Sequence, residues 1–311
     1  MTHPKIAVIG CGAIGTTLAY TLLLHHPHLE ISLVNRNPQK AWAKAFDMSH
    51  CSPELPNRAI RAETPEECSG SDIIIMTAGA LPRENGTRAD VLKDNVAIFQ
   101  TLLPTLARNN PDAVLINITN PVDAMAYAAG KITGFPPERV IGSGTELDSM
   151  RLRHFIAQAL DLNAAELDIQ VIGEHGDSMV PLWSLATYQG KSLTEAYPLL
   201  NEDLKATLLH QTKRAGWDIR LAGEHSCYGI AFSAVRIVES ILGWSDKPVR
   251  VSAELQCEFG LPHSFISLPT TLNRTGIIQR HLPDISDAEY QLVMHSANLV
   301  QQQLDMVRQL L

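Results

Sequence analysis

Short apolar segments alternate with helical stretches along the first half of the chain. The apolar segments KIAVIG, LEISLV and SDIIIMTAGA begin at residues 5, 29 and 71, and TTLAYTLLLHH and AWAKAFDM lie between them. Further strands are indicated by DAVLINIT (residues 112–119) and RVIGSGT (residues 139–145). Parallel strands need long crossover connections and are buried on both faces, so apolar segments joined by helices are typical of them. The pattern predicts an α/β fold with a doubly wound parallel sheet.

From residue 144 the pattern of elements changes. Helices are indicated by LDSMRLRHFIAQAL, by a polar stretch over residues 201–223, by residues 231–242 and by a final stretch over residues 287–311. Strands are indicated by LDIQVIG, VRVSAEL and SFISLPTTL, which do not alternate regularly with these helices. Such a mixture is typical of an α+β domain. We therefore predict a first domain over residues 1–143 and a second, α+β domain over residues 144–311.

Composition excludes several classes of protein. The 311 residues are 45% hydrophobic and 19% charged, a balance that is typical of a globular chain. The net charge is −8 and no basic block is present, so neither nucleic acid nor an anionic membrane is an expected partner. No apolar run approaches the roughly 20 residues that a spanning helix needs, and a strand begins at once without a charged leader. We expect a cytoplasmic protein.

The cysteines give no sign of a structural cross-link. Cys11, Cys51, Cys68, Cys227 and Cys257 are odd in number and scattered, and they include no Cys-x-x-Cys pair. We therefore expect neither a disulfide framework nor a zinc site, and we interpret these residues as reduced thiols packed in the fold.

A glycine-rich turn follows the first predicted strand. Gly10, Gly12 and Gly15 form a Gly-x-Gly-x-x-Gly pattern that ends a strand and opens a helix. In that context Gly10 permits a tight turn, Gly12 lets the backbone approach a pyrophosphate, and Gly15 lets the helix pack closely on the strand. The phosphates would lie at the N–H groups of the helix N-terminus. The turn predicts a Rossmann-type dinucleotide site; the alternative is a glycine turn that binds nothing.

An Asn-Arg pair stands where such a unit usually carries an acid. Twenty residues after the last glycine, an Asp normally accepts the ribose hydroxyls of NAD and repels the 2′-phosphate of NADP, but this chain has Asn35 followed by Arg36. Asn35 keeps an acceptor without the repulsion, and Arg36 can bind a phosphate through its planar guanidinium. Two hypotheses stay open: the protein accepts NADPH as well as NADH, or Asn35 serves NAD alone and Arg36 is a solvated charge.

Three further segments carry more polar residues than packing requires. They are TAGALPRENGTRADVL, GTELDSMRLRHF and VIGEHGDSMVPLWS, which begin at residues 77, 144 and 171. Asp148 and Arg151 are three residues apart on a predicted helix, so they share a face. His175 lies between Gly173 and Gly176 after an apolar strand, which favours an exposed, positioned side chain over a core one. These residues are candidate catalytic or binding groups.

In combination these segments resemble the L-lactate/malate dehydrogenase family. The resemblance covers nearly the whole chain, from the glycine turn through DAVLINITNPVDAM, GTELDSMRLR and GEHGDS to LPTTLNRTGI. It implies a Rossmann-type domain with a second α+β substrate domain, a homodimer or homotetramer, and NAD or NADP as the cofactor. The implied reaction interconverts a 2-oxo acid and an L-2-hydroxy acid by hydride transfer.

The resemblance implies roles for individual residues. His175 matches the family's proton-transferring histidine, and a histidine near its ordinary pKa exchanges protons at neutral pH. Asp148 matches the acid that fixes the tautomer of that imidazole and stabilises its charged form. Arg151 matches the arginine that binds the substrate carboxylate through two parallel hydrogen bonds. Arg88 matches the arginine that polarises the substrate carbonyl when a lid closes.

Other positions are implied by the same resemblance. Asn120, in ITNPVD, resembles a residue that contacts the substrate oxygen and the cofactor, although Asn-Pro is also a common turn former. Ser226 falls where the family has a small hydroxyl or an alanine lining the substrate pocket. The implied cofactor-binding residues are Gly10, Gly12, Ala13, Ile14, Gly15, Asn35, Arg36, Thr77, Ala78, Gly79, Asn95, Ile118 and Asn120.

The choice of acid is implied to depend on the lid. There an arginine pairs the second carboxylate of oxaloacetate and a glutamine suits pyruvate, because an unpaired buried charge is costly. Arg83 favours malate, but it lies one residue nearer to Arg88 than the family's selector, with Pro82 in the nominal place. The segments GEHGDS, VPLWS, YGIAFSAVRI and LNRTGI look more like the lactate and branched 2-hydroxy acid branch. We predict an L-lactate-type enzyme, with malate dehydrogenase as the alternative.

Two other classes share this architecture. NAD-dependent glycosidases hold a divalent metal with Cys and His, and the sequence offers His50 beside Cys51 but no such pair near the expected nicotinamide site. A non-catalytic dinucleotide-binding protein would bind the cofactor without turnover. Against that last interpretation stands the joint presence of His175, Asp148, Arg151 and Arg88.

Overall fold

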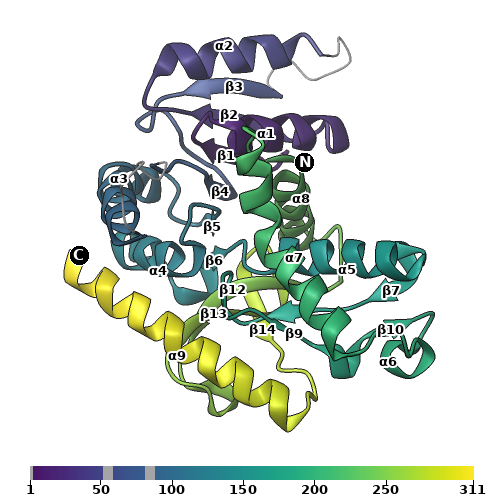
Figure 1. Ribbon diagram of the computed structural model, residues 1–311. Helices are drawn as coiled ribbons and strands as arrows, with labels where there is room; N and C mark the ends of the chain where they lie inside the picture. Colours follow the sequence, from purple (N-terminus) through teal and green to yellow (C-terminus); the bar gives the residue numbers. More distant parts are fainter. Residues whose placement is uncertain (1–2, 52–58, 81–87) are drawn as a thin grey trace.

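The computed structural model describes residues 3–51, 59–80 and 88–311. Within these residues, one sheet contains nine strands in the order β14–β13–β12–β6–β5–β4–β1–β2–β3 (Figure 1). The strands of this sheet are β1 (Lys5–Ile9), β2 (Glu30–Val34), β3 (Ile60–Glu63), β4 (Ile73–Met76), β5 (Val114–Asn117), β6 (Val140–Gly142), β12 (Val249–Leu255), β13 (Ser264–Asn273) and β14 (Gly276–Arg280).

Helices and short strands complete the described part of the chain. The helices are α1 (Ala13–His25), α2 (Pro38–Ser49), α3 (Arg88–Asn109), α4 (Val122–Thr133), α5 (Glu146–Leu160), α6 (Leu193–Ala196), α7 (Glu202–Leu221), α8 (Tyr228–Leu242) and α9 (Asp287–Leu310). Single 3₁₀ turns cover Pro137–Arg139, Ala164–Glu166, Trp183–Leu185 and Glu258–Gly260. The short strands are β7 (Leu167–Asp168), β8 (Val171–Ile172), β9 (Val180–Pro181), β10 (Thr187–Tyr188) and β11 (Lys191–Ser192). Over the described ranges, no helix combines the length and the apolar character needed to cross a membrane.

The first half of the chain forms a parallel, doubly wound sheet. Strands β3, β2, β1, β4, β5 and β6 pair in parallel, and the chain reverses its direction of winding between β1 and β4. The predicted fold class is therefore confirmed. In sheets of this kind, ligands bind beyond the carboxyl ends of the strands at the point of reversal. Both the glycine turn after β1 and the segment after β4 lie there.

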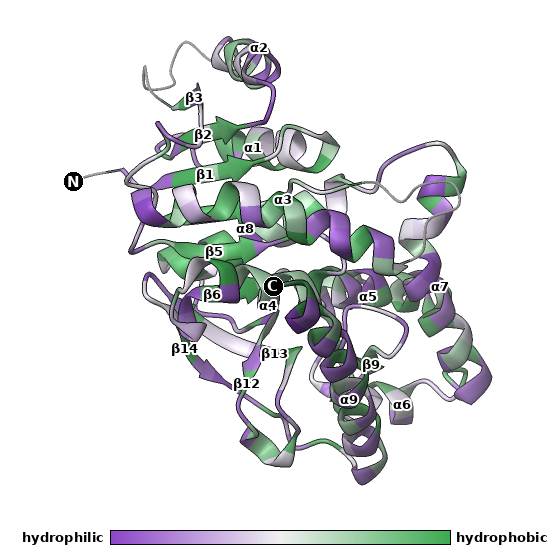
Figure 2. Cartoon of the chain, turned by 90° about the vertical axis from the view of Figure 1, so that its left-hand side faces the viewer, coloured by the Kyte–Doolittle hydropathy of each residue, from purple (hydrophilic) through white to green (hydrophobic). Residues whose placement is uncertain are grey.

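Successive residues of a strand point to opposite faces, and each face is covered by helices. In β1, Ile6 and Val8 belong to an apolar cluster with α1, α2 and α8. Ala7 and Ile9 belong to a second cluster with α3, α4 and α9. A third cluster joins α5 and α7 to the short strands. Figure 2 shows the consequence: the central strands are mostly hydrophobic, whereas helices such as α7 and α9 alternate between hydrophobic and hydrophilic residues.

The second half of the chain extends this same sheet. Strand β12 pairs antiparallel with β6 through Ser252 opposite Gly142, and β13 and β14 follow as antiparallel neighbours. A Cβ at Gly142 would lie 3.0 Å from the Cβ of Ser252, so glycine permits the close approach of these strands. The pairing was not foreseen, because the sequence does not indicate which distant strand β12 will adjoin. The division between residues 143 and 144 stays a prediction.

Helix ends follow local sequence signals. Asn37 caps α2 by accepting a backbone N–H of its first turn (3.1 Å), and Pro38 occupies the start of that helix. Ser286 and Glu289 form a capping box at the start of α9. The last turn of α8 is closed by Gly243, whose φ of 75° lies in the left-handed region that favours glycine.

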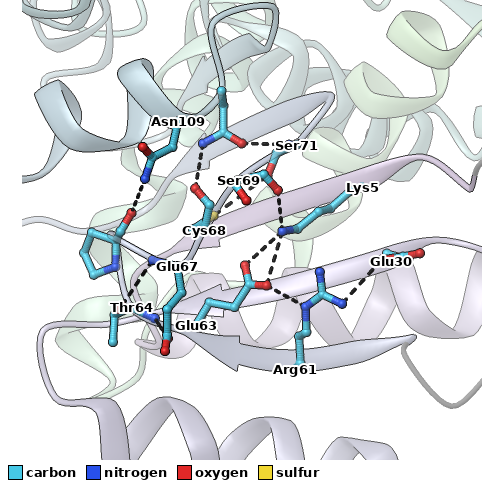
Figure 3. Close-up of polar contacts among 12 residues, drawn as sticks. Lys5, Glu30, Arg61, Glu63, Thr64, Glu67, Cys68, Ser69, Ser71 and Asn109 are labelled. Carbon is cyan, nitrogen blue, oxygen red and sulfur yellow. Dashed lines mark hydrogen bonds and ion pairs between the residues drawn. The ribbon is translucent and has the colours of Figure 1, made fainter.

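Charged side chains cover one face of the sheet where it ends at β3 (Figure 3). The Nζ of Lys5 lies 3.0 Å from Oε2 of Glu63 and donates to the carbonyl oxygen of Ser69 at 2.7 Å. Arg61 donates from Nε to Oε1 of the same carboxylate (2.6 Å), and its Nη1 lies 3.6 Å from Glu30. Burial alone would raise the pKa of Glu63, but the bonds from Lys5 and Arg61 outweigh it and hold that pKa below its usual value.

We expect Lys5→Met to destabilise the protein. The Lys5 and Glu63 side chains are only 9% and 11% exposed, so loss of the ammonium leaves a buried carboxylate paired with Arg61 alone. The free energy of unfolding at pH 7, measured by urea denaturation, should fall by about 2 kcal/mol.

The Lys5→Met deficit should depend on pH. Because the pKa of Glu63 is depressed in the fold, its contribution is present above the carboxyl's unfolded pKa and is lost as pH falls through its folded pKa, so the deficit should shrink in acid. The exposed Lys191 provides a matched control, and Lys191→Met should change stability by less than about 0.5 kcal/mol. Equal losses in the two variants would show that the buried pair contributes nothing specific.

Candidate active site

His175 and Asp148 come from two different elements of the second half of the chain and contact each other. His175 lies in the loop between β8 and β9, and Asp148 lies in the first turn of α5. The Nδ1 of His175 is 2.6 Å from Oδ2 of Asp148, and the Asp148 side chain is 1% exposed. A carboxylate can only accept, so Nδ1 donates and Nε2 stays available to a ligand. Burial alone would lower the pKa of His175, but the charge and hydrogen bond of Asp148 outweigh it and raise that pKa.

The loop that carries His175 is anchored on both sides. Gly173 adopts a φ of +88°, and a Cβ there would lie 2.8 Å from Oγ of Ser296, so this position requires glycine. The same hydroxyl accepts the backbone N–H of Glu174 at 2.8 Å. The carboxylate of Glu174 accepts from the backbone N–H of Ser178 (3.1 Å) and from Nε2 of Gln303 on α9 (2.8 Å). These bonds fix the loop in one conformation.

Arg151 lies beside this pair, on the face of α5 predicted from its spacing. Its Nη1 is 3.6 Å from Oδ1 of Asp148, and its Nη2 donates to Oγ of Ser226 at 3.1 Å. Ser226 precedes α8, so this contact joins two elements that are far apart in the sequence. Burial lowers the pKa of Arg151, although Asp148 opposes that effect, and the guanidinium remains charged. The structure thus brings His175, Asp148, Arg151 and Ser226 together.

Two residues of the site were missed by the sequence analysis. Asp123, in the first turn of α4, accepts the backbone N–H of His175 through Oδ2 at 2.9 Å. Glu174 anchors the loop as described above. Both stand in segments already singled out, NPVD and GEHGDS, and an acid beside each motif was the available signal. The partner atoms could not be foreseen, because they lie far away in the chain.

The glycine turn has the shape that a pyrophosphate needs. Gly10 has a φ of +109°, and a Cβ there would lie 2.8 Å from the backbone nitrogen of Ala78. A Cβ at Gly15 would lie 2.0 Å from the carbonyl oxygen of Gly10, so helix α1 and strand β1 approach as predicted. A Cβ at Gly12 would meet no described atom within 4 Å, and the first turn of α1 has no acidic side chain. The exposed start of this helix, at Ala13, is open to an anion.

The ends of β1 and β4 are joined next to this turn. Oγ1 of Thr77 lies 3.0 Å from the carbonyl oxygen of Ile9 and 3.1 Å from that of Gly10. The carbonyl oxygen of Ala78 accepts from Oγ1 of Thr119 at 2.8 Å. Thr77 and Ala78 therefore lie against the glycine turn. Ile14, in the first turn of α1, is partly buried and packs against the apolar cluster that contains Ile6 and Val8.

Asn95 ties the segments after β4 and β5 together. Its Oδ1 accepts the backbone N–H of Ala80 at 2.6 Å, and its Nδ2 donates to the carbonyl oxygen of Asn120 at 2.7 Å. A Cβ at Gly79 would lie 3.3 Å from Oδ1 of Asn95, so glycine leaves room for this bridge. The Asn120 side chain is exposed, and Ile118 is buried in the core. The roles in cofactor binding expected of these residues stay predictions.

Asn35 lies at the carboxyl end of β2, beside the glycine turn. Its Oδ1 accepts the backbone N–H of Cys11 at 3.4 Å, and its Nδ2 donates to the carbonyl oxygen of Asn37 at 3.2 Å. The adjacent Arg36 is exposed. An amide thus occupies the place of the usual acid without adding a negative charge.

Some expected residues lie outside the described part of the chain. Arg83 falls within residues 81–87, which the structure does not describe, and the side chain of Arg88 is likewise outside it. Their roles stay predictions. Among the described residues no group of three or more His, Cys, Asp or Glu side chains could hold a metal ion. His50 and Cys51 directly follow α2. Because a crossover helix runs antiparallel to the strands, its last residues lie near the amino ends of the strands. The glycine turn lies at the carboxyl ends, so His50 and Cys51 are on the opposite side of the sheet from it.

Known proteins resemble this chain over its whole length. Residues 4–142 match the family described as lactate/malate dehydrogenase, NAD binding domain, and residues 145–310 match its alpha/beta C-terminal domain. The chain belongs to the lactate/malate dehydrogenase family. This result confirms the predicted family, and with it an oxidoreductase that carries an NAD-binding domain.

Individual relatives agree with this membership. An L-lactate dehydrogenase of Clostridium perfringens is 33% identical over 300 residues, which cover 95% of each chain. One of Gloeobacter violaceus is 34% identical over 318 residues, which cover 98% of this chain and 96% of the relative. The crystal structure of a minor L-lactate dehydrogenase from Enterococcus mundtii has a TM-score of 0.93 at 30% identity and covers 99% of both chains. Membership in the lactate/malate dehydrogenase family leaves the glycosidase and non-catalytic alternatives without support.

Gly12→Ala should weaken cofactor binding without unfolding this lactate/malate dehydrogenase. The added methyl has space in the protein but would stand between the backbone and a pyrophosphate, so the Kd for NADH, measured by calorimetry, should rise about tenfold or more. The melting temperature should be nearly unchanged. Gly15→Ala is the contrast: its Cβ would lie 2.0 Å from a carbonyl oxygen, so it should lower the melting temperature markedly. Unchanged NADH affinity in Gly12→Ala would place the phosphates elsewhere.

Proposed function

We propose that this chain is an L-lactate-type 2-hydroxy acid dehydrogenase in which His175 exchanges a proton with the substrate oxygen. The observation that carries the proposal is the 2.6 Å contact between His175 Nδ1 and the buried carboxylate of Asp148, with Arg151 beside it. This arrangement offers a proton donor and a carboxylate receptor within one site. The relatives named above support the lactate type, because each of them is an L-lactate dehydrogenase.

The residues divide the work of reducing a 2-oxo acid. A bound nicotinamide supplies the hydride. Asp148 accepts a hydrogen bond from Nδ1–H of His175, which leaves Nε2 for the substrate and stabilises the imidazolium that donates the proton from Nε2. The raised pKa of His175 keeps a larger fraction of the ring protonated at neutral pH than an ordinary histidine would have. In the oxidation direction the neutral ring accepts the proton.

Arg151 is suited to hold the substrate carboxylate. Its guanidinium is half-buried, and the low local dielectric strengthens its attraction for an anion. Two parallel N–H groups match the two oxygens of a carboxylate. Ser226 already accepts one hydrogen bond from Nη2, so it fixes the orientation of the planar group. For the lactate type we propose that Arg83 stays outside the substrate pocket, and a malate dehydrogenase is the alternative if Arg83 enters it.

The cofactor proposal goes beyond NAD. Asn35 bonds the glycine turn through Oδ1 and carries no charge that would repel a 2′-phosphate, while the exposed Arg36 lies next to it. We therefore propose that NADPH is accepted as well as NADH. The roles of Arg88, Asn120 and the remaining cofactor-binding residues belong to the same proposal.

Assembly as a homodimer or homotetramer is also proposed, in the cytoplasm. Four helices each expose two large apolar side chains spaced four residues apart, and such pairs form a ridge along one helix face. Exposed apolar side chains that gather in ridges are found at protein interfaces. The pairs are Tyr20 and Leu24 on α1, Trp42 and Phe46 on α2, Trp217 and Leu221 on α7, and Tyr228 and Phe232 on α8.

A grid of initial rates tests the proposed reaction. Pyruvate, a branched 2-oxo acid and oxaloacetate are compared with NADH, and kcat/KM for the monocarboxylates should exceed that for oxaloacetate by ~10²-fold, because a second buried carboxylate lacks a partner. A preference for oxaloacetate would replace the lactate type by malate dehydrogenase. In that case Arg83→Gln should reverse the preference.

The same assay tests the roles of the two central residues. Asp148→Asn should reduce kcat by ~10²- to 10³-fold and move the alkaline limb of the reduction profile to lower pH, because reduction needs the imidazolium that Asp148 stabilises. Asp112→Asn, at a side chain 99% exposed, is the matched control and should leave the rate unchanged. Retention of full activity in Asp148→Asn would refute the proton-exchange role.

The cofactor proposal is tested by restoring the usual acid. Asn35→Asp should lower kcat/KM for NADPH by ~10- to 100-fold and change that for NADH by less than about threefold, because the new carboxylate repels the 2′-phosphate. Arg36→Gln should lower NADPH use by about tenfold if the guanidinium binds that phosphate. If the wild-type enzyme turned over NADH but not NADPH, the proposal of dual cofactor use would be wrong and Asn35 would serve NAD alone.

A further inference from the structure

A second carboxylate lies directly behind the loop that carries His175. Asp123 occupies the first turn of α4 and is 3% exposed. Its Oδ2 accepts the backbone N–H of His175 at 2.9 Å, and its Oδ1 accepts a hydrogen bond from the hydroxyl of Ser252 on β12. Ser252 Oγ in turn lies 3.4 Å from Oγ of Ser267 on β13. Asp123 therefore joins α4, the loop and the antiparallel extension of the sheet at one buried point.

This position places His175 between two acids. Asp148 of α5 holds the imidazole at Nδ1, and Asp123 of α4 holds the backbone of the same residue. Within the part of the chain that the structure describes, two further charged groups act on the pair: Arg151 of α5 disfavours the imidazolium, and Glu174 of the loop disfavours ionisation of Asp123. The two acids lie on different helices and bond different atoms of His175, so neither can make the other's hydrogen bond.

We propose that Asp123 is a positioning residue for the dehydrogenase reaction: it fixes the backbone of His175 in the site, and its charge sustains the protonated imidazole. The inference rests on the proposed function, since it assumes that His175 exchanges the proton. Asp123 is buried behind the backbone of His175 and acts on the reaction through His175.

The ionisation of Asp123 lies in the range where the enzyme would work. Burial raises its pKa to about 7, against the opposing effects of the Ser252 hydrogen bond and the charge of His175. The charge of the Asp123 carboxylate favours the imidazolium, and the imidazolium favours the carboxylate, so the two groups titrate as a coupled pair. Loss of the Asp123 charge should therefore lower the pKa of His175 and leave less imidazolium at neutral pH.

Asp123→Asn separates charge from geometry. The amide oxygen can still accept the His175 N–H, and the amide nitrogen can donate to Ser252, so both hydrogen bonds persist and only the charge is lost. We expect the alkaline limb of the pyruvate reduction profile, and the acid limb of lactate oxidation, to move to lower pH. An NMR titration of the His175 ring should show the same fall in pKa, and it needs no turnover.

Two further variants and a control complete the test. Ser252→Ala removes a hydrogen bond that stabilises the charged carboxylate, so it should move the limbs in the same direction even if Asp123→Asn does not fold. Asp123→Ala loses the anchor as well, and should lower kcat by ~10- to 100-fold without changing the Kd for NADH. Asp112→Asn removes an exposed charge and should change neither the limbs nor the ring titration.

The outcomes separate this inference from the proposed function. Unchanged His175 titration in both Asp123→Asn and Ser252→Ala would overturn the electrostatic role, and wild-type kcat in Asp123→Ala would overturn the positioning role. If the wild-type chain had no dehydrogenase activity but its His175 ring still titrated lower in Asp123→Asn, the proposed function would fail while the coupling of Asp123 to His175 would stand.

Discussion

The arrangement of this site depends on one buried negative charge, that of Asp148. An ionised carboxylate out of water is costly unless charged or hydrogen-bonding partners surround it. Asp148 is 1% exposed, and its partners are the His175 imidazole at 2.6 Å and the Arg151 guanidinium at 3.6 Å. The cost of burial is offset only when α5 and the loop between β8 and β9 are both in place. His175 and Arg151, the groups proposed to act on the substrate, are therefore held by the same contacts that stabilise the buried charge of Asp148.

The sheet brings the parts of the site to one edge. The chain reverses its winding between β1 and β4, so the glycine turn and the Thr77–Gly79 segment lie side by side beyond the carboxyl ends of their strands. Strand β12 then pairs with β6 and places Ser252 where its hydroxyl donates a hydrogen bond to Asp123. The two halves of the chain share one sheet, so the glycine turn of the first half is held relative to the strands of the second half by backbone pairing and not by a flexible linker.

Local signals predicted most of the elements. The apolar alternation identified β1, β2, β4 and β5, and a positive φ at Gly10 with the close approach at Gly15 matches the reading of the turn. The helical spacing of Asp148 and Arg151 predicted their common face, and the two side chains do meet. Strand β3 and the pairing of β12 with β6 were not foreseen, because a strand's partner is fixed by contacts between segments far apart in the chain.

The sequence by itself determined most of the elements, the family and the candidate residues of the site, because periodicity, glycine placement and motif spacing are properties of neighbouring residues. Only the tertiary structure decided which side chains and backbone groups contact one another in the site. Asp123 and Glu174 have no local pattern that distinguishes them from surface acids, and their roles follow from a backbone N–H and side chains brought near by the fold. The physical reason is that a hydrogen bond needs its two atoms within a few ångströms in space, whereas Asp123 and His175, or Glu174 and Gln303, lie tens of residues or more apart in the chain.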